Sequence, residues 1–199
     1  MLSQLADNSR TDKNTVHSYL DLYETLLSPR KDTAKNVLEV GIGVLDCGNG
    51  HIGHTNGGSI KMWHDYFQNA TIHALDIEPI TKIWSEIRNK SRINLYTSID
   101  AYDYNTFKNL LLDINIKFDV LLDDGSHRLD HMLNFVKYYS QIMADDGILI
   151  VEDIADISWV DKLKEATPDN LKQYVKFYDL RNIKGRYDDI VFVIDKRNM

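Results

Sequence analysis

The sequence places acidic residues and a histidine directly after two short apolar runs. The segment Asp123 to His127 (D-D-G-S-H) follows the first run, and Glu152-Asp153 follows the second. If the two runs are neighbouring parallel strands, which lie about 5 Å apart, side chains at their ends can converge on one cation. Asp124, Glu152 and Asp153 would then supply the hard oxygen ligands that suit Mg²⁺ or another hard divalent cation.

His127 lies beside these predicted ligands and can titrate near neutral pH. A bound cation would lower the pKa of a substrate hydroxyl, and His127 would take its proton. Holding the resulting oxygen in line with the group to be transferred would supply much of the rate. We therefore predict His127 to be the catalytic base of a reaction at a hydroxyl.

Other interpretations of these residues stay open. The acids could cap the helices that follow them, although one cap would have sufficed where the sequence has an Asp pair. His131 lies four residues after His127 and could complete a zinc pair, but no H-E-x-x-H motif accompanies it, and a packing or substrate-side role suits it better. Cys47, His51 and His54 could form a zinc cluster, for which no fourth ligand is apparent.

Three earlier features suit a nucleoside. Leu38 to Gly43 ends an apolar run in G-x-G, where a glycine such as Gly41 lets a ligand approach the backbone, although a tight turn has the same pattern. Asp76 ends the next run, at the position where such folds bind a ribose. Asp100 follows the third run and could accept a hydrogen bond from the exocyclic amine of adenine, or could cap a helix.

The elements that must position these residues alternate between strand and helix, which is typical of a mostly parallel sheet. The predicted strands are Asn36 to Gly43, Thr71 to Ile77, Ile93 to Thr97, Phe118 to Asp123, Gly147 to Glu152, Val175 to Asp179 and Ile190 to Asp195. The predicted helices are Thr15 to Leu27, Ser59 to Phe67, Ile80 to Asn89, Thr106 to Ile114, Leu129 to Met143 and Val160 to Ala166.

The last two predicted strands are separated by residues 180–189, which is too short for a crossover helix, so they should form an antiparallel hairpin. The predicted fold class is therefore α/β, a Rossmann-like, seven-stranded and mostly parallel sheet with an antiparallel C-terminal hairpin. With 199 residues, 43% of them hydrophobic, we expect one domain over residues 1–199.

Composition excludes several classes of partner. The net charge is −7 and no Lys/Arg cluster stands out, so nucleic acid is not a predicted partner. The single cysteine, Cys47, allows no disulfide framework within the chain and fits a reducing compartment. The first residues lack the apolar core of a signal peptide, and no apolar run is long enough to span a membrane, so we expect a cytoplasmic location.

The chain resembles the metal-dependent, class I sugar O-methyltransferases of macrolide biosynthesis, of the mycinamicin and tylosin type, over nearly its whole length. The resemblance rests on Thr11-Asp12-Lys13 with His17 and Tyr19, on Leu38 to Gly41, on Gly57-Gly58-Ser59 with Trp63, on Asp76, on the D-D-G-S-H segment and on Glu152-Asp153. The D-D-G-S-H and Glu-Asp elements are the most specific of these.

The resemblance implies S-adenosylmethionine as cofactor, Mg²⁺ held by Asp124, Glu152 and Asp153, and His127 as base. It implies a sugar hydroxyl as acceptor, on a 6-deoxyhexose such as rhamnose in a glycan or glycoside. Residues 1–30 would form a segment and helix that cover the methionine end of the cofactor. The residues implied to contact the cofactor are Thr11, Lys13, His17, Tyr19, Glu39, Gly41, Ser59, Asp76, Asp100 and Asp123.

Two departures from the family leave questions open. The stretch Val44 to Gly58 looks longer and richer in His than the family's turn, so the resemblance does not predict the shape of the acceptor pocket. The extra N-terminal domain of the macrolide enzymes is not matched, so a homo-oligomer and a place within a larger, glycosyltransferase-type protein both stay open. Rival hypotheses are a catechol-type O-methyltransferase and a non-catalytic nucleotide-binding module.

Overall fold

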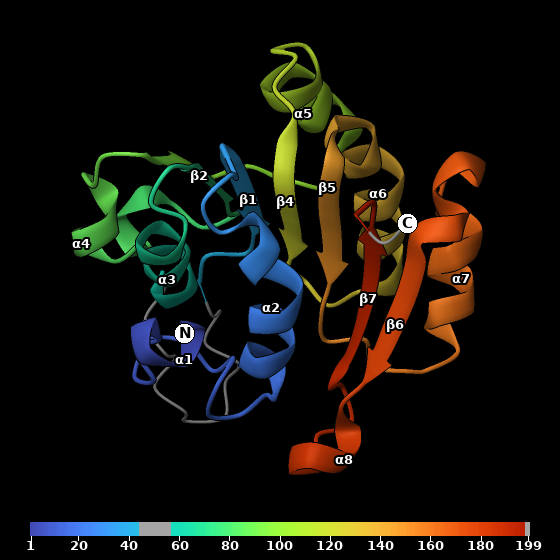
Figure 1. Cartoon of the computed structure of the whole chain (residues 1–199). Coiled ribbons are helices and arrows are strands. Elements are labelled where there is room, and N and C mark those ends of the chain that lie inside the picture. Colours follow the sequence, from blue (N-terminus) through green and yellow to red (C-terminus); the bar gives the residue numbers. More distant parts are fainter. Residues whose placement is uncertain (44–56, 198–199) are drawn as a thin grey trace. The chain divides into compact units, whose positions relative to one another are not determined.

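The computed structural model describes residues 1–43 and 57–197 (Figure 1). The chain divides into two compact units, Met1–Ile99 and Asp100–Met199. Cys47, His51 and His54, with most of the stretch Val44 to Gly58, lie outside the described residues. One domain over residues 1–199 stays a prediction.

The unit Met1–Ile99 is built on three parallel strands in the order β3-β2-β1. These are β1 (Asn36–Val40), β2 (Thr71–Leu75) and β3 (Ile93–Tyr96). In β1 and β2 every residue after the first is buried. Because both faces of these strands are buried, their sequences consist mostly of consecutive apolar residues and do not alternate between apolar and polar ones.

Short helices complete this unit: α1 (Leu2–Leu5), α2 (Tyr19–Leu27), η1 (Ser28–Arg30), α3 (Gly58–Tyr66), η2 (Ile80–Lys82) and α4 (Ser85–Arg88). Helix α1 packs on α2 and α3, and α3 packs on β2. The helix predicted from Thr15 begins only at Tyr19, because turns occupy the preceding residues and place three N–H groups on the carbonyl of Asp12. The helix predicted from Ile80 to Asn89 is interrupted by the extended residue Ile83.

The unit Asp100–Met199 holds four strands in the order β4-β5-β7-β6: β4 (Phe118–Asp123), β5 (Met143–Val151), β6 (Val175–Asp179) and β7 (Ile190–Asp195). β4 and β5 are parallel, whereas β7 is antiparallel to both β5 and β6. The predicted C-terminal hairpin is therefore confirmed, with α8 (Arg181–Lys184) in its connection. All seven predicted strands are found, and the predicted fold class is confirmed.

The remaining helices of this unit are α5 (Tyr104–Phe107), η3 (Lys108–Leu112, a π-helical turn), α6 (Leu129–Tyr139), η4 (Ser140–Ile142), α7 (Trp159–Ala166) and η5 (Asp169–Tyr174). Helix α6 packs on β4, β5 and α7 (Figure 1). The prediction that Met143 ends a helix is wrong. Met143 opens β5, whose pairing with β4 shifts register between Phe118 and Val120, so the strand begins before Gly147.

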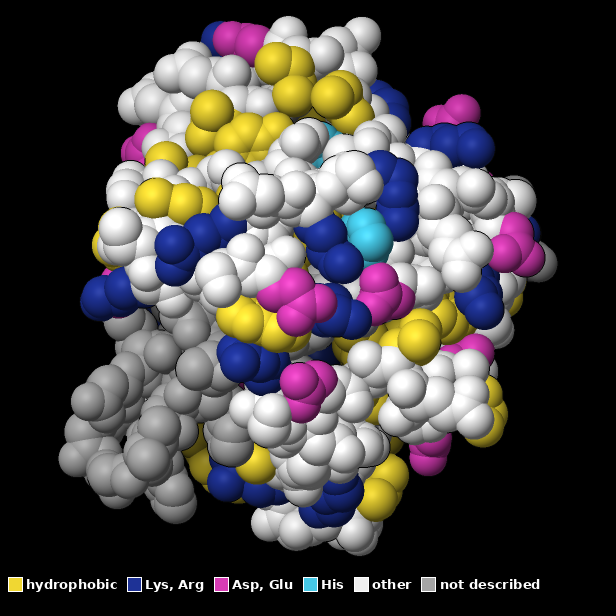
Figure 2. All heavy atoms as spheres, turned by 90° about the vertical axis from the view of Figure 1, so that its left-hand side faces the viewer, with side chains coloured by type: hydrophobic (Ala, Val, Ile, Leu, Met, Phe, Trp, Pro, Cys, Tyr) yellow, Lys and Arg dark blue, Asp and Glu magenta, His cyan; other side chains and the backbone are white. Residues whose placement is uncertain are grey.

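Basic and acidic side chains are interspersed on the face of the molecule drawn in Figure 2. Within residues 1–43 and 57–197, no helix combines the length and the apolar character needed to cross a bilayer.

Buried His73 predicts how the stability of the first unit depends on pH. Its side chain is 3% exposed, its ring stacks on Tyr96, and burial lowers its pKa from 6.5 to about 4. His73 binds its proton more tightly in the unfolded chain than in the folded one. The free energy of unfolding is therefore highest above about pH 6.5, and it falls by about 3 kcal/mol as the pH is lowered toward 4. Urea unfolding at pH 7 and pH 4.5 should show a smaller loss for His73→Phe than for the wild type; equal losses would contradict the assignment.

Candidate metal and cofactor site

Asp124, His127 and Asp153 come together at the ends of β4 and β5. The two strands are paired up to Asp123 and Val151, so the segments that follow them start side by side. One ligand atom of each of the three residues lies within 4.8 Å of the others. His127 Nε2 lies 3.5 Å from Asp124 Oδ1 and 3.3 Å from Asp153 Oδ2. The predicted third carboxylate, Glu152, is 1% exposed and does not belong to this group of three.

The structure removes the capping interpretation of these acids. The residue before α6 is Arg128 and the residue before α7 is Ser158, so neither Asp124 nor the Glu152-Asp153 pair caps a helix. His127 precedes α6 whereas His131 lies within it, so the two histidines do not share a helical face as a zinc pair would require.

The backbone at both strand ends is unusual. His127 has φ 54° and Asp153 has φ 57°, in the left-handed region that residues with side chains rarely enter. Each such residue costs about 1 to 3 kcal/mol and persists only where the surrounding structure enforces it. Here the two turns direct the His127 and Asp153 side chains toward each other.

Electrostatics in the cluster favour a positive charge. Burial lowers the pKa of His127, but the interaction with Asp124 and the charges of Asp153 and Asp123 outweigh it and raise this pKa to about 9. The imidazole, with its side chain 45% exposed, is therefore protonated at neutral pH and partly balances the carboxylates. A cation on the same carboxylates would offset the charge that holds this proton, leaving the ring free to act as a base.

The buried carboxylate of Asp123 also suggests that this site binds a ligand. Its side chain is 3% exposed, and burial raises its pKa to about 7 even though the hydroxyl of Tyr102 donates a hydrogen bond to Oδ1. Its other oxygen, Oδ2, is buried and has no hydrogen-bond partner among the described residues. A buried acceptor without a donor is costly. The carboxylates and this unused acceptor together fit a hard divalent cation and a polar ligand.

The unit Met1–Ile99 brings three of the predicted cofactor residues into one buried cluster. Glu39 is fully buried, and it accepts hydrogen bonds from the Ser59 hydroxyl, at 2.7 Å, and from the indole N–H of Trp63. The Lys13 ammonium lies 3.9 Å from the same carboxylate. A buried ion pair is tolerated when further hydrogen bonds satisfy it, as here. The arrangement ties the end of β1 to α3 and to the segment around Lys13.

Asp76 and Gly41 lie at neighbouring strand ends of the same unit. Oδ2 of Asp76 accepts hydrogen bonds from the backbone N–H groups of Ile42, at 2.7 Å, and Gly43, at 3.1 Å, and Oδ1 accepts one from Glu78. Gly41 has φ 93°, which a residue with a side chain rarely adopts. The carboxylate predicted to bind a ribose thus also shapes the turn after β1.

The remaining predicted cofactor residues are placed as follows. Thr11 and His17 are buried, and the His17 ring stacks on that of buried Tyr19 at 4.9 Å. Asp100 is exposed and accepts a hydrogen bond from the N–H of Tyr102, whereas the helix cap considered for Asp100 is provided by Asp103. Contact of any of these residues with a cofactor stays a prediction.

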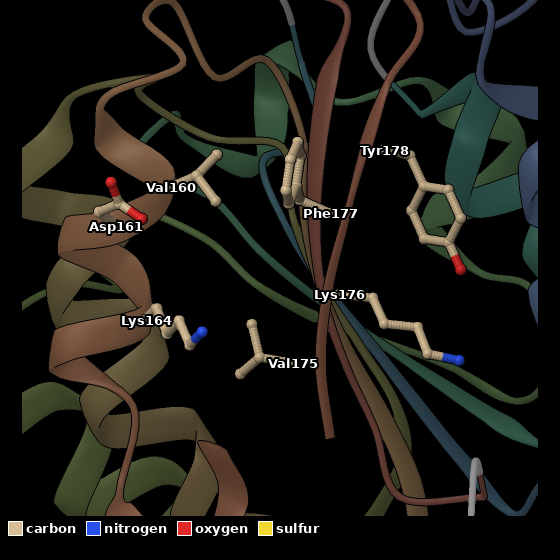
Figure 3. A pocket seen from close by; sticks show the side chains of 7 residues that line it. All are labelled: Val160, Asp161, Lys164, Val175, Lys176, Phe177 and Tyr178. Atoms are coloured by element: carbon tan, nitrogen blue, oxygen red, sulfur yellow. The ribbon is translucent and has the colours of Figure 1, made fainter. Parts of the chain in front are cut away.

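A pocket of about 390 Å³ lies away from these residues, between α7 and β6 (Figure 3). Val160, Asp161 and Lys164 line it from the helix. Val175 and Phe177 of β6 point toward α7, whereas Lys176 and Tyr178 point to the other side of the strand (Figure 3). It contains none of the predicted site residues, so we do not assign the chemistry to it.

Sequence reasoning missed Tyr102. Its hydroxyl bonds to Asp123, its ring stacks on His131, and it is 8% exposed. In the sequence, Tyr102 is only an aromatic residue two positions after Asp100, between Ala101 and Asp103, and no motif includes it.

The curated proteins that are similar to this chain in sequence are named as O-methyltransferases. No family model matches the chain. It is 27% identical over 158 residues to 8-demethyl-8-alpha-L-rhamnosyl tetracenomycin-C 2'-O-methyltransferase of Streptomyces olivaceus, covering 79% of this chain and 39% of the relative. It is 28% identical over 159 residues to L-olivosyl-oleandolide 3-O-methyltransferase of Streptomyces antibioticus, covering 79% and 38%.

The solved structure of the MycE methyltransferase from the mycinamycin biosynthetic pathway, in complex with Mg, SAH and mycinamycin VI, matches with a TM-score of 0.74 at 20% identity. The match covers 99% of this chain and 54% of the MycE chain. This chain therefore spans little more than a third of the curated relatives' length and about half of MycE. The chain is similar in sequence to sugar O-methyltransferases of the macrolide and tetracenomycin pathways, and its fold is that of the class I S-adenosylmethionine-dependent methyltransferases.

Proposed function

We propose that the chain transfers the methyl group of S-adenosylmethionine to a sugar hydroxyl and requires a divalent metal for this reaction. The convergence of Asp124, His127 and Asp153 at the ends of β4 and β5 carries the proposal. Two carboxylates and an imidazole within 4.8 Å of one another support hydroxyl chemistry at a metal, which uses both kinds of group, more than nucleotide binding alone, which needs neither.

The metal ligands in this proposal are Asp124, Asp153 and Glu152. When bound, Mg²⁺ would supply Lewis-acid activation of the acceptor hydroxyl. Asp124 and Asp153 hold the negative charge that draws the cation to the strand ends. His127 takes the hydroxyl proton at Nε2, the nitrogen that faces both carboxylates.

The cofactor assignment follows the resemblance, residue by residue. Asp76 and Asp100 bind the ribose and the adenine amine, Gly41 allows close approach at the end of β1, and Asp123 offers its unused Oδ2. Residues 1–30 cover the cofactor, with Thr11 and the other predicted residues of that segment. The buried Glu39 cluster holds the start of α3 in place for this purpose.

The acceptor class rests on the relatives. Curated proteins with detectable sequence similarity are named for methyl transfer to rhamnosyl and olivosyl groups. We infer a 6-deoxyhexose such as rhamnose, in a glycoside or glycan, as acceptor. The matching enzymes are longer than this chain, so the activity of the chain by itself is the first thing to measure.

The test is mass spectrometry of L-rhamnosyl and other deoxysugar glycosides incubated with the protein, S-adenosylmethionine and Mg²⁺. A methylated glycoside is expected, with formation abolished by EDTA and restored by excess Mg²⁺. Catechol is included as a rival acceptor. Product from catechol alone would favour the catechol-type alternative, and methylation that withstands EDTA would refute the metal requirement.

Isothermal titration with S-adenosylmethionine, together with the acceptor experiment, distinguishes a methyltransferase from a non-catalytic nucleotide-binding module. Cofactor binding without transfer to any acceptor in the panel would favour a nucleotide-binding module. Absence of cofactor binding would overturn the proposal as a whole.

A further inference from the structure

Three side chains of the unit Asp100–Met199 form a closed set of contacts around the segment that carries Asp124 and His127. The Tyr102 hydroxyl accepts a hydrogen bond from the backbone N–H of Ser126, at 3.3 Å. The Ser126 hydroxyl lies 2.7 Å from Nδ1 of His131. The His131 ring stacks back on the ring of Tyr102, with centroids 4.3 Å apart and planes inclined by 27°. We call these residues the clamp.

The clamp holds the segment at two points. Besides accepting from Ser126, the Tyr102 hydroxyl donates to Oδ1 of Asp123, at 2.5 Å, at the end of β4. Only Asp124 and Gly125 lie between these two anchored residues. The position of the Asp124 carboxylate is therefore restricted from both sides.

The second anchor also precedes the strained residue of the site. His127, with φ 54°, directly follows Ser126, which is held through both its N–H and its hydroxyl. A left-handed conformation at a residue with a side chain persists only where neighbouring contacts enforce it. Loss of the clamp would let the backbone at His127 relax and would move the imidazole away from Asp153.

We propose that Tyr102 and His131 are positioning residues, which hold Asp124 where it binds the cation and keep His127 beside it. This inference rests on the proposed function, because it requires that the carboxylates bind a divalent metal. Packing alone does not account for the clamp. A phenylalanine would fill the space of Tyr102 equally well, but both partners of its hydroxyl belong to the ligand-carrying segment.

The first experiment measures Mn²⁺ affinity by electron paramagnetic resonance in the 199-residue chain and in its Tyr102→Phe variant, which keeps the ring and removes the hydroxyl. Because the variant loses both hydrogen bonds of the hydroxyl, and one such bond is worth about three- to tenfold, we expect Mn²⁺ binding to weaken by about tenfold or more. Tyr138→Phe is the matched control, because Tyr138 lies on α6 with its ring on Phe107 and Tyr104. It should bind Mn²⁺ as the wild type does.

The second experiment is a double-mutant cycle between Ser126→Ala and His131→Phe, again read out as Mn²⁺ affinity. If both residues act through their shared hydrogen bond, each single variant and the double variant should be weakened by a similar factor. Effects that multiply, or single variants with wild-type affinity, would overturn the clamp.

The Mn²⁺ measurements distinguish failure of the proposed function from failure of the clamp. Wild-type protein that binds no Mn²⁺ would overturn both the proposed function and the clamp. Wild-type binding with equal binding by Tyr102→Phe would overturn the clamp alone, and would leave the methyl transfer to be decided by the acceptor experiment.

Discussion

Asp124→Asn should reduce methyl transfer by more than about 100-fold, while the affinity for S-adenosylmethionine changes by less than about twofold. The substitution keeps the shape of the side chain and removes one of the two carboxylates that lie against His127. Mutating a residue that only supports a metal ligand typically lowers metal affinity or activity by about 10- to 100-fold. Mutating a ligand itself should therefore cause a larger loss. Initial rates and isothermal titration measure the two quantities.

Asp145→Asn is the matched control for this variant. Asp145 is an exposed carboxylate on β5, so the same chemical change should leave the rate at the wild-type value. If Asp124→Asn kept the wild-type rate with the same acceptor, Asp124 would not be a ligand. Partial recovery at high Mg²⁺ concentration would show that the lost activity reflects cation affinity.

His127→Ala tests the other half of the same site and separates a base from a ligand. As a base, His127 contributes about 10²- to 10⁴-fold to the rate, and its removal leaves both carboxylates in place. Mn²⁺ binding should then persist or strengthen, because the imidazolium no longer competes for Asp124 and Asp153. Loss of Mn²⁺ binding in this variant would instead identify His127 as a metal ligand.

Strands β1, β2, β4 and β7 were predictable because nearly all of their residues are buried, which gives mostly apolar runs, whereas β3 and β6 are only partly buried. The predicted bounds of β4, β6 and β7 are those that the structure shows, and the acids at the ends of β4 and β5 could be placed side by side from topology alone. Helix bounds were less predictable. The sequence around Thr15 has helical spacing, yet hydrogen bonds to the carbonyl of Asp12 delay the helix to Tyr19.

Contacts between residues far apart in the sequence explain what the motifs did not reveal. Nothing in the local sequence says that Tyr102 bonds to Asp123, because the two are joined only when the chain returns through β4. Likewise, the left-handed backbone conformation at His127 and Asp153 could not be predicted, because neither residue is a glycine. The sequence predicted that Asp124, His127 and Asp153 gather at the strand ends, whereas Glu152 lies outside this group, and the contacts that fix the geometry required the structure.

Substituting Gly58 tests how the segment before the first strand packs on α3. Alanine at this position would favour the helix but would clash with that segment. Gly58 opens α3, and within a helix alanine is normally favoured over glycine by about 1 kcal/mol. A Cβ at Gly58, however, would lie 2.5 Å from the carbonyl carbon of Arg10 and closer still to its carbonyl oxygen. These are backbone atoms, so the segment that leads into Thr11 and Lys13 must move.

We expect Gly58→Ala to lower the free energy of unfolding by about 1 to 3 kcal/mol, the usual cost of overpacking, despite the gain in helix propensity. Displacing Arg10 would also disturb its guanidinium, which lies 3.9 Å from the centre of the Trp84 ring, and the buried Lys13 beside Glu39. If residues 1–30 cover the cofactor as proposed, affinity for S-adenosylmethionine should fall as well. Urea unfolding and isothermal titration measure the two effects.

Gly185→Ala is the control for the steric argument. Gly185 has φ 74°, and a Cβ added there would meet no described atom within 4 Å, so alanine has only the backbone cost of about 1 kcal/mol and should leave cofactor affinity unchanged. A Gly58→Ala protein as stable as the wild type, or more stable, would mean that helix propensity outweighs the contact with Arg10. Wild-type affinity for S-adenosylmethionine in a destabilised Gly58→Ala protein would refute the proposed role of residues 1–30 in covering the cofactor.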